Sequence, residues 1–343
     1  MKALVKSRPE TGIWMEEIDV PVPKDDEVLI KVKCASICGT DSHIYQWDSW
    51  AQDAVTVPMT IGHEFSGVIE EVGRSVSRIS IGDRVTAEGH IVETHSRAAR
   101  AGRYHLDSHT KGIGIRVPGA FAEYICVPAF NVIALPDNCS FEVGSILDPF
   151  GNAVHAVGSF SCLGEDVLIT GAGPIGLMTA LVAERSGAHK IAITDINPYR
   201  LDLARSVTNV RVVDSRSENL KDVMTELGMT EGFDLSFEAS GSPAAMQDVI
   251  KTTIMGGKIA VIGIPKGKML IDWGQIIFKA LTIKAIYGRE MFDTWYKSKS
   301  LISSGTDLAP LITHRFEFED YEQAFELISS GQSGKIILNL QDI

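Results

Sequence analysis

The feature that most constrains the fold lies between residues 166 and 286, where short apolar segments alternate regularly with segments of helical periodicity. The predicted limits of the apolar segments are 167–171, 190–195, 210–213, 234–238, 258–263 and 281–286. These segments are apolar enough to be buried on both faces, as the strands of a parallel sheet are, and the helical segments can supply the crossovers. Six such strands predict an α/β domain with a doubly wound parallel sheet, a Rossmann fold.

Three glycines follow the first predicted strand in the pattern Gly171-Ala-Gly173-Pro-Ile-Gly176, where a helix is expected to begin. In this context Gly171 allows a tight turn, Gly173 lets a pyrophosphate approach the backbone, and Gly176 lets the helix pack close to the sheet. Asp195 ends the next predicted strand, 19 residues beyond Gly176, where a carboxylate can accept hydrogen bonds from a ribose. A glycine-rich loop without a ligand would not account for Asp195. We therefore predict a dinucleotide-binding site.

Asp195 also indicates which dinucleotide binds. A carboxylate at this position repels the extra 2′-phosphate of NADP, so NAD is favoured. Arg200 lies five residues further on, where it could pair with a phosphate, cover the adenine or face solvent as an ordinary helix residue. Asp195 outweighs Arg200 in this interpretation, and Arg200 is a further candidate for contact with the cofactor.

The segments on either side of this region have a different pattern. Before about residue 140, short β-branched segments bounded by turn residues predict a mostly antiparallel domain, with strands at 27–32, 66–72, 83–87 and 120–127. After residue 288 the pattern predicts two amphipathic helices, at 291–304 and 321–330, and a last strand at 335–340. We expect a catalytic domain at 1–147, the dinucleotide domain at 148–288, and a segment at 289–343 that returns to the first domain.

Charge and composition exclude several classes of function. The 343 residues include 32 basic and 44 acidic side chains, and the formal net charge of −12 disfavours binding to nucleic acid or to an anionic membrane surface. The N-terminus lacks the apolar stretch of a secretory signal, and the longest uncharged run, 167–183, is shorter than the roughly 20 residues that cross a bilayer. The five cysteines have no disulfide-framework spacing, which suits a reducing compartment. We expect a cytoplasmic protein that acts on a small molecule, without a nucleic-acid or membrane partner.

A second group of reactive residues lies in the first domain, where Cys38-Gly-Thr40-Asp-Ser-His43 is followed by Gly62-His63-Glu64. Thiolate, imidazole and carboxylate are ligands that zinc prefers, and a catalytic zinc site has about three protein ligands and one open position. Taken alone, a cysteine and a histidine 25 residues apart are more often ordinary core or surface residues.

A longer pattern supports the metal site. The sequence Gly62-His63-Glu64-x-x-Gly67-x-x-x-x-x-Gly73-x-x-Val76, with Cys38 upstream and the glycine motif downstream, resembles the zinc-containing medium-chain alcohol dehydrogenases. The resemblance covers essentially the whole chain and implies a GroES-like catalytic domain beside the Rossmann domain. It implies that Cys38, His63 and Glu64 hold one catalytic zinc, and that Asp148 approaches or exchanges at the metal.

The resemblance implies further site residues. Thr40 and His43 match a proton relay, in which a hydroxyl and an imidazole carry the substrate proton to water. His90 resembles a position near the substrate pocket. The implied contacts of loop residues with the cofactor are Ile175, Ile262, Gly263, Ile264, Ile286 and Tyr287. The alternatives are that Thr40 caps a turn, that His43 is a surface histidine, and that Asp148 starts a turn.

Within the family, the chain is similar to the branch that oxidises L-threonine with NAD. The similar stretches are 12–15, 38–45, 148–155, 286–292, 313–316 and 330–335. This similarity implies oxidation of the 3-hydroxyl to 2-amino-3-oxobutanoate in the degradation of threonine to glycine, a homotetramer, and a downstream ligase that acts on the product. The alternatives are a zinc-dependent polyol or 2,3-butanediol dehydrogenase of the same fold and a non-catalytic nucleotide-binding protein.

The chain departs from the family at one place. Most zinc-containing members hold a second, structural zinc with four cysteines, and the corresponding positions here are Glu93, Ser96, Ala99 and Asp107. Alanine supplies no ligand and serine a poor one, so the structural zinc is predicted to be absent. An improvised site of Glu93, His95, His105 and Asp107 is the alternative. We expect packing, or an ion pair of Arg97, Arg100 or Arg103 with Glu93 or Asp107, to hold this segment.

Overall fold

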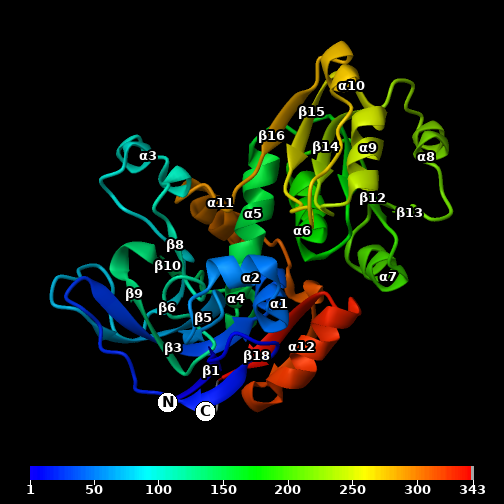
Figure 1. The fold of residues 1–343 in the computed structure, drawn as a ribbon. Helices are drawn as coiled ribbons and strands as arrows, with labels where there is room; N and C mark the ends of the chain where they lie inside the picture. Colours follow the sequence, from blue (N-terminus) through cyan, green and yellow to red (C-terminus); the bar gives the residue numbers. More distant parts are fainter. Residues whose placement is uncertain (341–343) are drawn as a thin grey trace. The chain divides into compact units, whose positions relative to one another are not determined.

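The computed structural model describes residues 1–340. The chain forms two compact units (Figure 1). Unit 1 contains Met1–Asp148 and the segment that begins at Glu290, and unit 2 is the continuous stretch Pro149–Arg289. Within residues 1–340, no helix combines the length and the apolar character that crossing a membrane would require.

Unit 2 is built on a six-stranded sheet with the strand order β13-β12-β11-β14-β15-β16. The strands are β11 (Asp166–Thr170), β12 (Lys190–Asp195), β13 (Arg211–Asp214), β14 (Phe233–Glu238), β15 (Thr253–Val261) and β16 (Thr282–Ala285). All of the pairings are parallel, which confirms the predicted doubly wound sheet. The strand order changes direction between β11 and β14, and in such sheets ligands bind at this point, at the carboxyl ends of the strands.

Helices connect the strands of unit 2. They are α6 (Pro174–Arg185), α7 (Pro198–Val207), α8 (Leu220–Glu226), α9 (Pro243–Thr252) and α10 (Trp273–Phe278). α7 and α9 each begin with a proline, after Asn197 and Ser242, whose side chains accept a backbone N–H from the first turn. Both features favour the start of a helix. Apolar side chains of the helices and strands, among them Phe233 and Val249, form a buried core on the sheet.

Unit 1 contains a seven-stranded sheet with the order β10-β6-β5-β3-β18-β17, and β9 also pairs with β3. A second sheet has the order β2-β1-β4, and β7 pairs with β8. The strands are β1 (Lys2–Lys6), β2 (Trp14–Glu17), β3 (Glu27–Ser36), β4 (Met59–Thr60), β5 (Glu64–Val72), β6 (Arg84–Ala87), β7 (His90–Ile91), β8 (Lys111–Gly112), β9 (Tyr124–Pro128), β10 (Val132–Ala134), β17 (Ile312–Glu317) and β18 (Lys335–Asn339). The helices are α1 (Gly39–Gln46), α2 (Ser49–Ala54), α3 (Arg97–Arg100), α4 (Phe141–Ser145), α11 (Asp293–Ser303) and α12 (Tyr321–Ser330), and α5 (Leu147–Gly158) spans the boundary with unit 2.

The C-terminal segment completes the large sheet of unit 1. β18 pairs antiparallel with β3 and parallel with β17. The sequence pattern does not predict β17, because its Ile-Thr-His-Arg-Phe-Glu sequence is mostly polar. The remaining pairings of this sheet are antiparallel, as predicted for the first domain.

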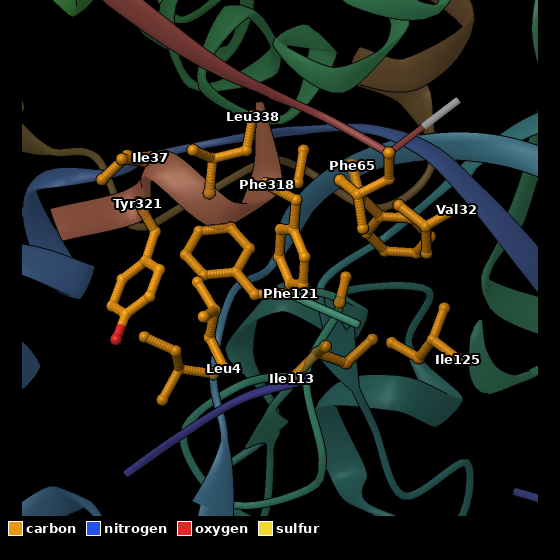
Figure 2. Packing of buried hydrophobic residues seen from close by; sticks show 14 of the residues in the cluster. Leu4, Val32, Ile37, Phe65, Ile113, Phe121, Ile125, Phe318, Tyr321 and Leu338 are labelled. Carbon is orange, nitrogen blue, oxygen red and sulfur yellow. The ribbon is translucent and has the colours of Figure 1, made fainter. Parts of the chain in front are cut away.

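The core of unit 1 joins residues from both ends of the chain. Figure 2 shows Leu4 and Phe121 pointing toward Phe318, Tyr321 and Leu338. All five side chains belong to one buried cluster. Burying a large apolar side chain contributes about 1.5–3 kcal/mol, so the packing of the C-terminal segment stabilises the sheet that carries Cys38 and His63.

Candidate functional site

Three potential metal ligands meet where β3 ends and β5 begins. Cys38 lies two residues after β3, at the start of α1, and His63 lies directly before β5. The antiparallel register pairs Ser36 with Glu64, so strand pairing brings the three residues together. Ligand atoms of Cys38, His63 and Glu64 all lie within 4.8 Å of one another, and this is the only such group of three or more found in residues 1–340.

Two glycines of the sequence pattern are required by close packing at this site. Gly62 has a φ of +91°, and a Cβ there would lie 2.2 Å from the ring of Phe121. A Cβ on Gly67 would lie 2.2 Å from the carbonyl oxygen of Lys31 on the paired strand β3. Both positions therefore exclude a side chain, and both help to set where His63 and Glu64 lie.

Asp41, in the first turn of α1, supports the cluster. Its side chain is completely buried, and its Oδ2 accepts a hydrogen bond from the Cys38 backbone N–H at 2.8 Å. Its Oδ1 lies 3.7 Å from Nδ1 of His63, and neither of these two atoms has a hydrogen-bond partner. Burial raises the pKa of Asp41 to about 6.

The charges at this site fit a divalent cation. Burial by itself lowers the pKa of His63, but Asp41, the Cys38 thiol and Asp148 outweigh this effect and raise it to about 10. The largely buried His63 ring, with 14% of its side chain exposed, therefore lies among an excess of negative groups. Sulfur, nitrogen and carboxylate oxygen form the donor set of catalytic zinc, and a carboxylate behind a histidine orients such a ligand.

Glu64 forms a buried ion pair that the sequence analysis did not predict. Lys335 of β18 donates a hydrogen bond to Oε2 of Glu64 and another to the carbonyl oxygen of Ile37, at 2.9 Å for the latter. Both Glu64 and Lys335 are buried. No local pattern signals this pair, because 271 residues separate its members.

The proposed relay residues lie on α1, and Asp148 lies on α5. Thr40 and His43 lie one turn apart on α1, and Thr40 is half-buried. The side chain of His43 is 48% exposed, and its Nδ1 lies 2.5 Å from Oδ2 of Asp48. Asp148 is buried in the first turn of α5, close enough to His63 to raise its pKa.

His90 is held by a buried carboxylate. Oε1 of Glu88 accepts hydrogen bonds from the backbone N–H of His90 at 2.9 Å and contacts Nδ1 of its ring at 2.8 Å. Oε2 of Glu88 accepts a hydrogen bond from the indole of Trp295 at 2.7 Å. Glu88 and Trp295 therefore fix the orientation of His90, and neither of them was predicted from the sequence.

The candidate cofactor residues lie at the carboxyl ends of the unit 2 strands. The glycine motif follows β11, Ile262 to Ile264 follow β15, and Ile286 and Tyr287 follow β16. Ile175 is in the first turn of α6. Gly171 has a φ of +92°, as its tight turn requires, and a Cβ on Gly176 would lie 1.8 Å from the Gly171 carbonyl oxygen.

Asp195 anchors the glycine loop as well as ending β12. Its Oδ2 accepts the backbone N–H of Ala172 at 2.7 Å, and its Oδ1 accepts those of Ile196 and Asn197 at 2.7 and 2.8 Å. The guanidinium of Arg200 lies 3.9 Å from Oδ2. Arg200 is also the nearest group to a Cβ placed on Gly173, at 3.8 Å, so Asp195, Arg200 and the glycine loop are neighbours.

Glu238 anchors the next loops in the same way. It is completely buried at the end of β14, and its carboxylate accepts hydrogen bonds from the hydroxyl of Thr170, the backbone N–H and hydroxyl of Ser240, and the N–H of Gly241. Its backbone oxygen accepts the N–H groups of Ile262 and Gly263 at 2.8 and 2.9 Å. One residue therefore connects three loops at this edge of the sheet.

Comparisons with known proteins agree with these features. One family model, the alcohol dehydrogenase GroES-like domain, matches residues 24–137, and another, the zinc-binding dehydrogenase, matches residues 174–304. An L-threonine 3-dehydrogenase of Rhizobium etli strain CFN 42 is 55% identical over 339 residues, which is 99% of this chain and 98% of that protein. The expected combination of a GroES-like domain with a Rossmann domain is confirmed.

Solved structures share the fold over nearly the whole chain. An alcohol dehydrogenase from Escherichia coli CFT073, complexed with NADH, has a TM-score of 0.91 at 26% identity and covers 99% of each chain. The 2R,3R-butanediol dehydrogenase of Bacillus subtilis has a TM-score of 0.88 at 29% identity, over 98% of this chain and 99% of its own.

We expect the substitution Cys38→Ser to remove bound zinc, because serine is a poor zinc ligand and leaves two donors. Metal analysis of the purified protein would show about one zinc per chain in the parent, the content of a single catalytic site, and almost none in the variant. Cys126→Ser is the control, since Cys126 lies on β9 outside the cluster. Full zinc content in the Cys38 variant would contradict the assignment.

Proposed function

Because the chain belongs to the L-threonine 3-dehydrogenase family of zinc-binding alcohol dehydrogenases, we propose that it oxidises L-threonine with NAD. The 3-hydroxyl becomes a ketone, which gives 2-amino-3-oxobutanoate. The identity of 55% over nearly the full length to the Rhizobium etli L-threonine 3-dehydrogenase carries this proposal. The butanediol dehydrogenase of Bacillus subtilis shares the fold at 29% identity, so a diol or polyol is the second candidate substrate.

We assign one zinc ion per chain to Cys38, His63 and Glu64, with Asp148 beside it. When bound, zinc supplies Lewis acidity that polarises the oxygen of the substrate. Asp41 restrains Cys38 through its backbone N–H and stands behind the ring of His63. Lys335 neutralises one oxygen of Glu64 and limits how closely this carboxylate approaches a metal. No structural zinc is expected, since Ala99 and Ser96 stand at two of the four ligand positions.

Thr40 and His43 are assigned to the removal of the substrate proton. The hydroxyl of Thr40 can accept this proton while passing its own onward. Asp48 accepts a hydrogen bond from Nδ1–H of His43 in the arrangement that leaves Nε2 as the basic nitrogen. Since about half of the His43 side chain is exposed, its ring can release the proton to water. His90, oriented by Glu88, is assigned to the substrate pocket.

Unit 2 is assigned to bind NAD, which accepts the hydride from the substrate carbon. The glycine loop and the N-terminus of α6 provide N–H groups for the pyrophosphate. A carboxylate has about four acceptor positions, so Asp195 can bind a ribose hydroxyl while it holds three backbone N–H groups. Its negative charge disfavours the 2′-phosphate of NADP. Arg200 and the loop residues Ile175, Ile262 to Ile264, Ile286 and Tyr287 are the further contacts.

The setting of the reaction follows from its chemistry. All five cysteines are free thiols, which persist in a reducing compartment such as the cytoplasm. The product is a labile 3-oxo acid, so a ligase that consumes it is the expected downstream partner. The net charge of −12 argues against a nucleic-acid or anionic membrane partner.

We further propose a homotetramer in which β16 contributes to a subunit contact. β16 is the last strand in its sheet, and apolar side chains are exposed on β15, on α10 and in the loop between them, the segment that leads to β16. These side chains are Met255, Leu270, Trp273, Ile277 and Phe278. An unpaired strand edge with adjacent apolar side chains favours pairing with another chain.

The proposed reaction is tested by following NADH formation with zinc-loaded protein. We expect turnover of L-threonine to exceed that of D-threonine, 2,3-butanediol and sorbitol, because the sequence is most extensively shared with an L-threonine 3-dehydrogenase. Removal of zinc should abolish turnover. Preference for a diol would move the function to the second candidate, and no turnover of any compound would favour a non-catalytic nucleotide-binding protein.

The substitution Glu238→Gln should weaken NADH binding roughly tenfold, since a buried charge-assisted hydrogen bond contributes about 1.5–3 kcal/mol. The new amide group would face the N–H groups of Ser240 and Gly241. Fluorescence titration with NADH measures the change. Glu231→Gln, at an exposed position of the same unit, is the matched control, and equal affinity in both variants would refute the role of Glu238.

Phe278→Asp should lower the mass measured by light scattering, because a charge would be buried at the proposed subunit contact. Phe278 is 82% exposed, so the substitution leaves the core of unit 2 intact. Leu163→Asp is the control, since Leu163 is 76% exposed in the same unit. An unchanged tetramer in the Phe278 variant would place the contact elsewhere.

A further inference from the structure

The segment 89–117, here called the lobe, is closed at its base by a short pair of strands. β7 pairs antiparallel with β8, and the register joins His90 to Gly112 and Ile91 to Lys111. Between these strands the chain forms α3 and a single 3-10 turn, Tyr104–Leu106. The four positions at which relatives of this family hold cysteines, Glu93, Ser96, Ala99 and Asp107, all lie within this closed loop.

The side chain of Asp107 is the buried acceptor of the lobe. It is completely buried, although the side chains of Glu93 and His109 beside it are 60% and 63% exposed. Its Oδ2 accepts the backbone N–H of Glu93 at 2.7 Å, and its Oδ1 accepts that of His109 at 3.3 Å. The Ser96 hydroxyl contributes to lowering the pKa of this carboxylate.

Ser96 extends the connection to the fourth position. Its Oγ accepts the backbone N–H of Ala99 at 3.1 Å and caps the start of α3. Ala99 is buried, so its methyl group occupies space inside the lobe rather than facing solvent. Side-chain hydrogen bonds therefore join the four positions in two pairs, Glu93 with Asp107 and Ser96 with Ala99.

We infer that the Asp107 carboxylate replaces the structural metal of the lobe, with the charges inverted. A zinc centre is a cation surrounded by electron-pair donors. Here the centre is an anion, and the surrounding groups present N–H and O–H hydrogens to it. Both arrangements hold residues that are distant in the sequence at one point, here Glu93 and Asp107, which are 14 residues apart, but they use opposite charges.

The titration of Asp107 agrees with this arrangement. Burial alone raises the pKa of a carboxyl group, but the N–H groups of Glu93 and His109 and the Ser96 hydroxyl outweigh burial and hold the pKa of Asp107 below its usual value. The charged form is therefore the stable one inside the lobe.

Other expected supports of the lobe differ from what the structure contains. Packing or an arginine ion pair was expected, and in the part of the chain that the structure describes none of Arg97, Arg100 and Arg103 forms an ion pair with Glu93 or Asp107. An improvised ligand cluster in the lobe is likewise not found in residues 1–340. The physical reason is that backbone N–H groups, which need no long side chain to be ordered, already occupy the Asp107 carboxylate.

Aromatic packing acts alongside the carboxylate. The ring of Tyr104 lies 5.4 Å from that of Phe130 in an edge contact, and Phe130 lies 4.8 Å from Phe292. These contacts join the lobe to the rest of unit 1. They do not involve Glu93, whose backbone N–H is bound by the Asp107 carboxylate.

Hydrogen exchange of the full-length protein tests the inference. In Asp107→Asn, an amide group would face the N–H groups, and backbone amides of 92–110 should exchange roughly tenfold faster or more, since a hydrogen bond to a buried charge is lost. Ser96→Ala removes one donor and should give a smaller increase in the same segment. Glu93→Gln is the matched control, because only the backbone of Glu93 contacts Asp107.

Treatment with a chelator provides an independent test of the inference. Removing zinc with 1,10-phenanthroline should leave exchange in 92–110 unchanged, and the parent should contain one zinc per chain rather than two. Two tightly bound zinc ions in the parent, faster exchange in 92–110 after chelation, or unchanged exchange in Asp107→Asn would each overturn the inference. The inference rests on the proposal that each chain binds a single zinc ion. Because hydrogen exchange is measured without turnover, a failure of this inference can be distinguished from a failure of the proposed reaction.

Discussion

Buried carboxylates that accept backbone N–H groups hold the functional loops of both units. A carboxylate offers several acceptor positions at one point, and when buried it gains more from these bonds than a neutral acceptor would. The residues that act in this way are Asp41, Glu88, Asp107, Asp195 and Glu238. Loops lack the regular backbone hydrogen bonds of strands and helices. A charged acceptor therefore fixes each of these loops where the proposed chemistry needs a rigid backbone.

Much of this protein could be predicted from its sequence because its strongest signals are local. The apolar strands at 166–286 and the glycines after β11 follow from periodicity and from the steric needs of a tight turn. β17 escaped prediction because three of its six residues are charged or contain imidazole, and its pairing with β18 overrides that composition. The close approach of Cys38, His63 and Glu64 was expected only from the resemblance to a family. No periodicity relates Cys38 to His63, which lies 25 positions further along the chain.

The supporting residues could not be found in the same way. An aspartate can accept the backbone N–H of almost any residue, whatever the side chain of that residue is. The hydrogen bond from the Glu93 backbone to Asp107 therefore leaves no pattern in the sequence. The pair of Lys335 and Glu64 depends on β18 entering the sheet beside β3, which is a property of the whole topology. The roles of individual site residues stay predictions, whereas their positions follow from the fold.

The place of β18 also has a consequence for the order in which the protein is made. Unit 2 is one continuous stretch of chain, so all of its strands have been synthesised before β17 and β18 of unit 1 are made. Unit 1 needs Phe318, Tyr321 and Leu338 for its core and Lys335 for its buried ion pair with Glu64. Because domains form as units during synthesis, the nucleotide-binding half can fold on the ribosome. The metal-binding half becomes complete only after β18 has been synthesised.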